Sequence, residues 1–187
     1  QQHRPGGRFR HGLHRLVFVP APQRRIAGVA GQAVGAADQH GLVVLGDDVV
    51  GQGDQVSTQA SIHRVDTAGN GDGVHTTSID QGVAFDIQGT GQLSKTGWTD
   101  GHDGLLALDL NHDGVINNST ELFGSSTRLA DGSQAPDGFV ALSQYDSNQD
   151  GVMDAHDAVF ASLKVWVDGN VDGVSQPNEL YSLMDLG

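Results

Sequence analysis

The sequence predicts a small α+β domain in which short helices and short strands are joined by acidic loops. Three observations predict it. Apolar runs after residue 66 are short and change between strand-like and helix-like spacing. The motif Asp-x-Asn-x-Asp-Gly recurs three times between these runs, and charge divides the chain near residue 65 into two unlike parts.

The first part of the chain has few signals of regular structure. Residues 1–65 carry seven Arg and four Asp, a net charge of +3, and are rich in Gly, Ala, Val and Gln. Residues 41–56 (GLVVLGDDVVGQGDQV) predict short strands, because two apolar runs flank Asp47 and Asp48. No stretch has a clear amphipathic helical face. We therefore interpret residues 1–65 as a weakly ordered or non-native N-terminal segment, and residues 66–187 as the domain.

Two strands and one helix are predicted first within the domain. Residues 82–87 (GVAFDI) and 103–110 (DGLLALDL) are apolar runs of strand length. Residues 137–146 (DGFVALSQYD) place Phe139 and Leu142 on one helical face, behind Asp137 at the positive start of the helix.

The last two predicted elements lie near the end of the sequence. Residues 154–167 predict a helix followed by a strand at KVWV. Residues 176–187 predict a helix, with Pro177 in its first turn and Gly187 past its end.

The acidity of the domain restricts its partners. Residues 66–187 hold 19 acids against three bases, a net charge of −16, and the whole chain has 21 Asp but only two Glu. Such a balance excludes nucleic acid as a partner, because phosphate binding requires clustered Lys and Arg. With no Cys there are no disulfides or thiolate metal sites, and no apolar run approaches the ~20 residues of a membrane span. The short stem of Asp suits tight oxygen cages around hard cations.

The loop at residues 146–157 (DSNQDGVMDAHD) has the spacing of a calcium loop. Calcium binds six to eight oxygens, and a 12-residue loop supplies them from alternate positions, with Gly at position 6 for the sharp turn. Here Gly151 occupies position 6. The predicted ligands are Asp146, Asn148, Asp150, the Val152 carbonyl, Asp154 and Asp157.

Two further loops repeat the pattern. In the loop at 168–179 the predicted ligands are Asp168, Asn170, Asp172, the Val174 carbonyl and Glu179. In the loop at 109–121 they are Asp109, Asn111, Asp113, the Val115 carbonyl and Glu121. Because Glu121 stands at position 13, this loop requires a one-residue bulge or a second partner. A fourth stretch, residues 65–77, keeps Asn70 and Asp72 but has Ala68 at position 1.

Several alternatives are open to a single motif of this kind. One copy is often only a solvated Asx-turn with a Gly exit, but three copies followed by Val favour calcium. Magnesium fits less well, because it resists losing its water. The expected fold is therefore a calcium-loaded α+β domain with EF-hand-like loops and an irregular N-terminal segment. Only ten residues separate Asp157 from Asp168, too few for a calmodulin-like pair of helices.

Residues 66–187 resemble the self-processing, calcium-binding module of RTX (repeat-in-toxin) proteins and type I-secreted adhesins. The resemblance rests on TGWTDGHDGLLALDLNHDG, ELFGSSTRLADGS, DGFVALSQYDSNQDGVMDAHDAVF and LKVWVDGNVDGVSQPNEL. It implies a secreted bacterial toxin or adhesin that folds on meeting extracellular calcium, and whose partners are calcium ions and another region of a larger parent protein. It also implies calcium-dependent cleavage of an Asp-Pro bond, followed by isopeptide ligation to a lysine.

The sequence departs from that pattern at the reacting bond. Its five prolines follow Arg4, Val19, Ala21, Ala135 and Gln176, so no Asp-Pro pair exists in these 187 residues. We therefore assign no catalytic residue and expect a calcium-binding module rather than an enzyme. The alternatives are self-processing and a dockerin-like docking module, which residues 146–163 also resemble.

Overall fold

The computed structural model describes residues 15–17, 45–49, 61–65 and 75–185. Its strands within these residues are short and are β1 Arg15–Val17, β2 Leu45–Val49, β3 Ser61–Val65, β4 Val83–Phe85, β5 Ser94–Thr96, β6 Gly104–Ala107, β7 Val152–Asp154, β8 Lys164–Trp166 and β9 Leu180–Ser182. Its helical elements are the 3₁₀ turns η1 Ile79–Gln81, η2 Ser119–Glu121 and η3 Phe160–Ser162, and the α-helix α1 Gly138–Ser143. No helix among the described residues has the length and apolar character needed to cross a membrane.

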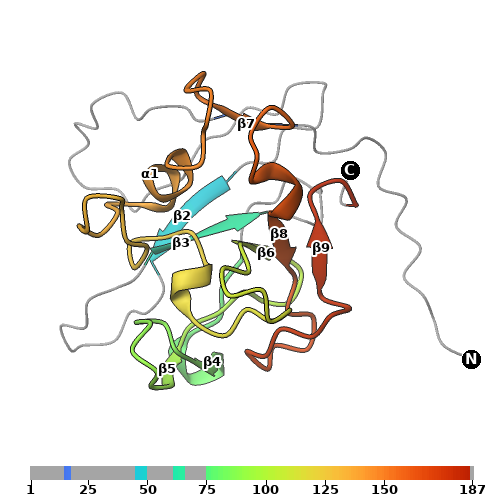
Figure 1. Cartoon of the computed structure of the whole chain (residues 1–187). Helices are drawn as coiled ribbons and strands as arrows, with labels where there is room; N and C mark the ends of the chain where they lie inside the picture. Colours follow the sequence, from blue (N-terminus) through green and yellow to red (C-terminus); the bar gives the residue numbers. More distant parts are fainter. Residues whose placement is uncertain (1–14, 18–44, 50–60, 66–74, 186–187) are drawn as a thin grey trace, which may run out of the picture.

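A five-stranded antiparallel sheet organises the domain, with strand order β2-β3-β6-β8-β9 (Figure 1). In the register, Leu105 of β6 stands opposite Trp166 of β8, which in turn stands opposite Leu180 of β9. Two smaller antiparallel sheets, β1-β7 and β4-β5, accompany it. The described residues therefore have mixed content, with few helices and several antiparallel strands.

The central sheet draws strands from both sides of residue 65. Strand β3 pairs with β6 through Arg64↔Leu105 and Val65↔Gly104, and β2 extends the sheet beyond β3. The predicted strand region at 41–56 thus contains one described strand, β2. Apart from β1, β2 and β3, residues 1–65 lie outside the described residues.

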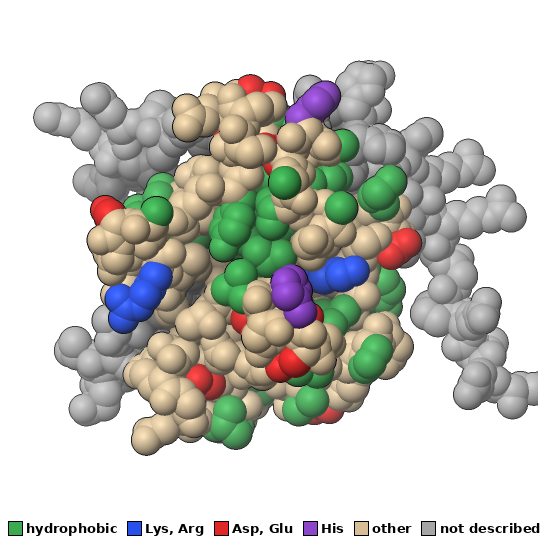
Figure 2. All heavy atoms as spheres, in the orientation of Figure 1, with side chains coloured by type: hydrophobic (Ala, Val, Ile, Leu, Met, Phe, Trp, Pro, Cys, Tyr) green, Lys and Arg blue, Asp and Glu red, His purple; other side chains and the backbone are tan. Residues whose placement is uncertain are grey.

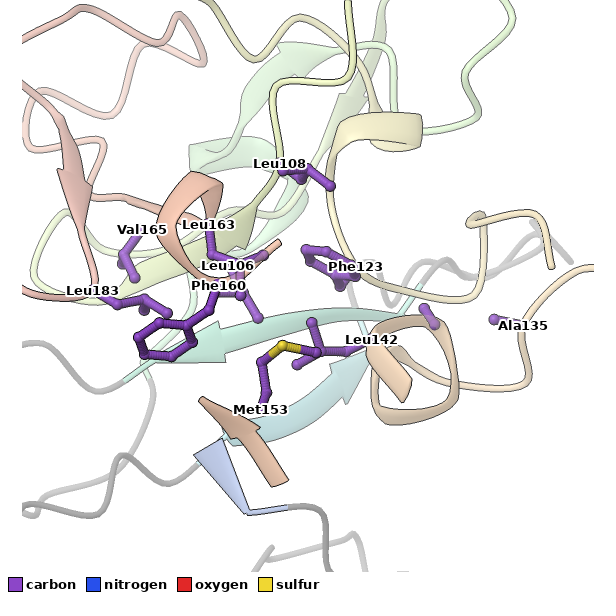
Figure 3. Close-up of a cluster of buried hydrophobic side chains, with 11 residues drawn as sticks. Leu106, Leu108, Phe123, Ala135, Leu142, Met153, Phe160, Leu163, Val165 and Leu183 are labelled. Atoms are coloured by element: carbon purple, nitrogen blue, oxygen red, sulfur yellow. The ribbon is translucent and has the colours of Figure 1, made fainter. Parts of the chain in front are cut away.

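Both faces of the sheet carry a buried apolar cluster. Successive side chains of a strand point to opposite faces, so Leu105 and Leu106 of β6 enter different clusters. The first cluster consists of Leu106, Leu108, Phe123, Ala135, Ala141, Leu142, Met153, Phe160, Leu163, Val165 and Leu183 (Figure 3). The second cluster consists of Val83, Phe85, Trp98, Leu105, Ala107, Ile116, Leu122 and Trp166.

The helix predicted at 137–146 is confirmed as α1. The Asp137 side chain accepts a hydrogen bond from Val140 N–H at 2.8 Å and so caps the helix N-terminus, an interaction worth about 1 kcal/mol. Ala141 and Leu142 are buried in the first cluster. The strands predicted at 82–87, 103–110 and KVWV are confirmed as β4, β6 and β8.

The two helices predicted after residue 154 are wrong. Asp154 ends strand β7, and residues 155–162 form turns and the 3₁₀ turn η3 instead of an α-helix. Residues 177–179 form a single turn, with Glu179 N–H bonded to the Gln176 carbonyl, and the chain then becomes strand β9. Pairing with β8 satisfies the backbone hydrogen bonds of β9. The turn that begins at Pro177 therefore does not continue into a helix.

Acidic side chains on the visible face of the molecule lie in separate spots rather than in one continuous patch (Figure 2). On this face the negative charge is therefore dispersed.

Candidate metal-binding loops

Each of the three acidic loops begins just after a regular element that is anchored in the core. The loop at 109–121 follows β6, the loop at 146–157 follows α1, and the loop at 168–179 follows β8. The first residue of each loop is therefore fixed by packing of the element before it.

The first Asp of each loop binds the backbone of its own turn. In all three loops its Oδ2 accepts the N–H of the Gly five residues later; the pairs are Asp109–Gly114 at 2.9 Å, Asp146–Gly151 at 2.9 Å and Asp168–Gly173 at 2.8 Å. This bond closes the turn, so that the following side chains are held around the same centre.

The third, fifth and seventh residues form a second repeated set of hydrogen bonds. The Asn oxygen at position 3 accepts the N–H of position 5, at 2.9, 3.1 and 3.1 Å in chain order. The Asp at position 5 accepts the N–H of Val at position 7; the pairs are Asp113–Val115 at 2.9 Å, Asp150–Val152 at 2.8 Å and Asp172–Val174 at 2.8 Å. The predicted ligands at positions 1, 3 and 5 are thus brought together in each loop.

The loops also share an unusual backbone. The residue at position 4 has a positive φ in each, which is rare for a residue other than Gly; these are His112 at 59°, Gln149 at 58° and Val171 at 55°. The Gly at position 6 has φ between 74° and 85° in all three. Glycine is favoured at position 6 because the left-handed conformation costs other residues about 1–2 kcal/mol.

The closing acid of each loop is buried and occupies an equivalent place. Each carboxylate accepts the N–H of position 9; the pairs are Glu121–Asn117 at 3.0 Å, Asp157–Asp154 at 3.0 Å and Glu179–Gln176 at 3.3 Å. Glu121 reaches this place from position 13 because the 3₁₀ turn η2 shortens the path of the chain before it. It also accepts the Leu110 N–H at 3.2 Å, as Asp157 accepts the Ser147 N–H at 2.7 Å.

Two carboxyls of the loop at 146–157 have lowered pKa values. Burial raises the pKa of Asp157, but hydrogen bonds from the Asp154 and Ser147 N–H groups and the Ser147 hydroxyl outweigh it and hold that pKa below its usual range. The His156 N–H, followed by the His156 ring, lowers the pKa of Asp154. Both side chains therefore carry negative charge at neutral pH.

The fit of these loops to a cation rests on their donor set. Among the residues that the structure describes, no three His, Cys, Asp or Glu side chains lie together in a ready metal centre. The predicted ligands are carboxylate, amide and carbonyl oxygens, which suit a hard cation. Within the described residues, Asp146 Oδ1 is buried and has no hydrogen-bond partner, so the loop at 146–157 holds an unsatisfied anionic oxygen.

Sequence reasoning missed the tryptophans that connect the loop at 168–179 to the second cluster. Trp98 Nε1–H donates to Asp168 Oδ2 at 2.8 Å, and Trp166 Nε1–H donates to Glu179 Oε2 at 3.4 Å. The first and last carboxylates of one loop thus meet the core. Neither contact had a signal in the sequence, because each joins segments that only the folded chain brings together.

A further turn with the same backbone, residues 86–91, was also missed. Asp86 accepts the N–H of Thr90 at 3.0 Å and of Gly91 at 2.7 Å, and Gly89 and Gly91 have φ values of 64° and 81°. It carries Gln88 and Thr90 where the three loops have Asn and Asp. The fourth stretch noted in the sequence, around Asn70 and Asp72, lies mainly outside the described residues.

Comparison with known proteins assigns most of the chain to one family. The family model described as the SPM domain matches residues 48–187. Iron-regulated protein FrpA of Neisseria meningitidis serogroup C is 48% identical to the chain over 120 residues. The aligned stretch covers 63% of this chain and 11% of that protein.

Proposed function

The chain belongs to the SPM domain family, and from that premise we propose that it is a calcium-binding module of a secreted RTX-type protein, ordered by calcium outside the cell. The three acidic loops would hold the ions, with the carboxylate, amide and carbonyl oxygens predicted from the sequence as ligands.

One observation carries the proposal. Three separate loops share one hydrogen-bonded geometry that places oxygen side chains at positions 1, 3 and 5 and a buried carboxylate at the closing position. The unsatisfied Asp146 Oδ1 supports it further, since a buried carboxylate oxygen without a partner is costly. A cation at that oxygen would remove the cost.

The energetics favour an ion-dependent fold. Calcium supplies positive charge that offsets the net −16 of residues 66–187. At a 100-fold excess of calcium over Kd, each site adds about 2.7 kcal/mol to the free energy of unfolding. Two or three such sites match a small domain's total of about 5–15 kcal/mol. Where free calcium is scarce, repulsion among the carboxylates of each loop would leave the folded domain less stable.

The relative supports the RTX part of the proposal. FrpA is an RTX-type protein, and its 48% identity supports an RTX-related role and secretion for this chain. Since the aligned stretch covers 11% of FrpA, the activity and targets of the whole relative are not transferred to this chain.

Calcium titration of the metal-free protein tests the proposal. Circular dichroism in EGTA and then in millimolar calcium should show a gain of structure and a large rise in Tm, and calorimetry should count two or three ions per chain. Magnesium at the same concentration is the control for nonspecific charge screening, and it should raise the Tm less than calcium does. An unchanged spectrum and Tm in calcium would reject the proposal.

The resemblance to self-processing modules supplies a second candidate, supported by family membership and the FrpA relative. Because these 187 residues contain no Asp-Pro pair, a longer gene product would have to supply the scissile bond. A calcium-triggered new band from that longer product on a denaturing gel tests the candidate; its absence would count against it.

A further inference from the structure

The loops at 109–121 and 168–179 are joined by one side chain. Ile116 N–H donates to Ser175 Oγ at 2.6 Å, and the Ser175 hydroxyl donates to the Ile116 carbonyl at 3.3 Å. Ile116 is 2% exposed and Ser175 is 3% exposed. The Ser175 hydroxyl satisfies both the N–H and the carbonyl of Ile116. Because this contact is buried, water does not take the place of the hydroxyl.

The bridge lies at the same place in both loops. Ile116 and Ser175 are each the eighth residue of their loop, between the position 7 carbonyl proposed as a ligand and the position 9 N–H that holds the closing acid. The neighbours on the ligand side are Val115 and Val174, and those on the other side are Asn117, bonded to Glu121, and Gln176, bonded to Glu179. A displacement of Glu121 or Glu179 is therefore passed to the Ile116–Ser175 contact through a single residue, Asn117 or Gln176.

The third loop is connected differently. Its eighth residue, Met153, lies in β7 and pairs with Leu16 of β1. Met153 is buried in the first cluster, whereas Ile116 is buried in the second cluster with Trp98 and Trp166. The two bridged loops thus share one side of the sheet, and the loop at 146–157 packs on the other.

We infer that the loops at 109–121 and 168–179 bind calcium as a cooperative pair coupled through Ser175, while the loop at 146–157 binds independently. The inference rests on the proposed function. An ion that fixes Glu121 also fixes Asn117 and Ile116, and the Ser175 hydroxyl passes that ordering to Gln176 and Glu179. Coupling between sites is reciprocal, so each loop raises the calcium affinity of the other by the same factor.

Trp98 provides a direct reporter for one member of the pair. Its indole N–H donates to Asp168, so its ¹H–¹⁵N signal should follow occupancy of the loop at 168–179. The chain has two Trp, and a Trp98→Phe variant assigns the two indole signals. Calcium titrations of the full chain, followed at this signal, measure the midpoint of this loop alone.

Six proteins test the coupling: wild type, Asp109→Ala, Ser175→Ala, the double variant of these two, Asp146→Ala and Ser119→Ala. Ser119→Ala is the matched control, because Ser119 is 2% exposed and its hydroxyl has no hydrogen-bond partner among the described residues. Asp109→Ala and Ser175→Ala should each weaken calcium binding at the Trp98 reporter by about 5- to 150-fold. The double variant should weaken calcium binding little more than either single variant does. Asp146→Ala and Ser119→Ala should leave the midpoint at the Trp98 reporter unchanged.

Unchanged midpoints in Asp109→Ala and Ser175→Ala, with calcium still bound, would overturn the coupling and leave the proposed function intact. A wild-type protein that binds no calcium by calorimetry would overturn both. If Ser175→Ala does not fold, Asp109→Ala decides alone, with Asp146→Ala as its control.

Discussion

Trp98 and Asp168, 70 residues apart in the sequence, form a buried hydrogen bond of 2.8 Å between an indole N–H and a carboxylate oxygen. The Gly173 N–H donates to the same oxygen at 2.8 Å. Trp98 packs edge-on against Trp166 with ring centroids 5.3 Å apart, and Trp166 faces Glu179. The loop at 168–179 and the second cluster therefore form one hydrogen-bonded unit.

Removing the indole donor should lower the free energy of unfolding more at Trp98 than at Trp166. Trp98→Phe leaves the buried Asp168 with one donor fewer, a loss of about 1–3 kcal/mol beyond that of ring volume. Trp166→Phe removes a longer bond of 3.4 Å from an equally buried ring and serves as the matched control. Urea denaturation of both variants measures the difference. Equal losses would mean that ring volume alone matters.

Gly173 should be far less replaceable than Gly151, although the two occupy the same loop position. Their φ values are 74° and 79°, so either substitution to Ala costs about 1–2 kcal/mol from backbone strain. A Cβ at Gly173 would also lie 2.9 Å from the Val83 side chain, whereas at Gly151 it would meet nothing within 4 Å. We expect a further loss of about 1–3 kcal/mol for Gly173→Ala only. Thermal unfolding of both variants without calcium checks this; equal Tm values would contradict it.

These contacts also mark the limit of sequence-based prediction here. Strands β4, β6 and β8 and helix α1 were predictable because each carries its own apolar pattern, and α1 has Asp137 as a cap. The shared turn geometry of the three loops was predictable because the spacing of their Asp, Asn and Gly residues is local. Strand β9 was not, because pairing between Trp166 and Leu180 decides its conformation. The Ile116–Ser175 and Trp98–Asp168 contacts join distant segments, and no local pattern announces them.

The lowered pKa of Asp157 predicts acid sensitivity of the metal-free protein. A carboxyl with a depressed pKa in the folded state stabilises the fold fully above its unfolded value of about 3.9, and this contribution is lost as pH falls through the folded pKa. Asp157→Asn should therefore flatten the dependence of Tm on pH below about pH 4. NMR titration of the Asp157 carboxyl in Ser147→Ala should show its pKa closer to the usual value, because the hydroxyl bond at 3.0 Å is gone. A pKa that does not move would contradict the role of Ser147.

Asp86 and Asp109 offer a test of what separates a structural turn from an ion-binding loop. Both carboxylates accept two backbone N–H bonds, from the residues four and five positions later. Asp109 is followed by Asn111 and Asp113, whereas Asp86 is followed by Gln88 and Thr90, so only the former has a carboxylate at position 5. Asp109→Asn should lower the calorimetric calcium count by one.

Asp86→Asn should instead lower stability in EGTA and in calcium alike, with the calcium count unchanged. The expected loss is about 1–3 kcal/mol, because Asp86 is buried and its two charge-assisted bonds to Thr90 and Gly91 weaken. Urea unfolding in both buffers, together with calorimetry, separates the two effects. A lower calcium count in Asp86→Asn would mean that the turn at 86–91 binds an ion despite its side chains. The Asn at position 3 and the Asp at position 5 would then not decide which turns bind calcium.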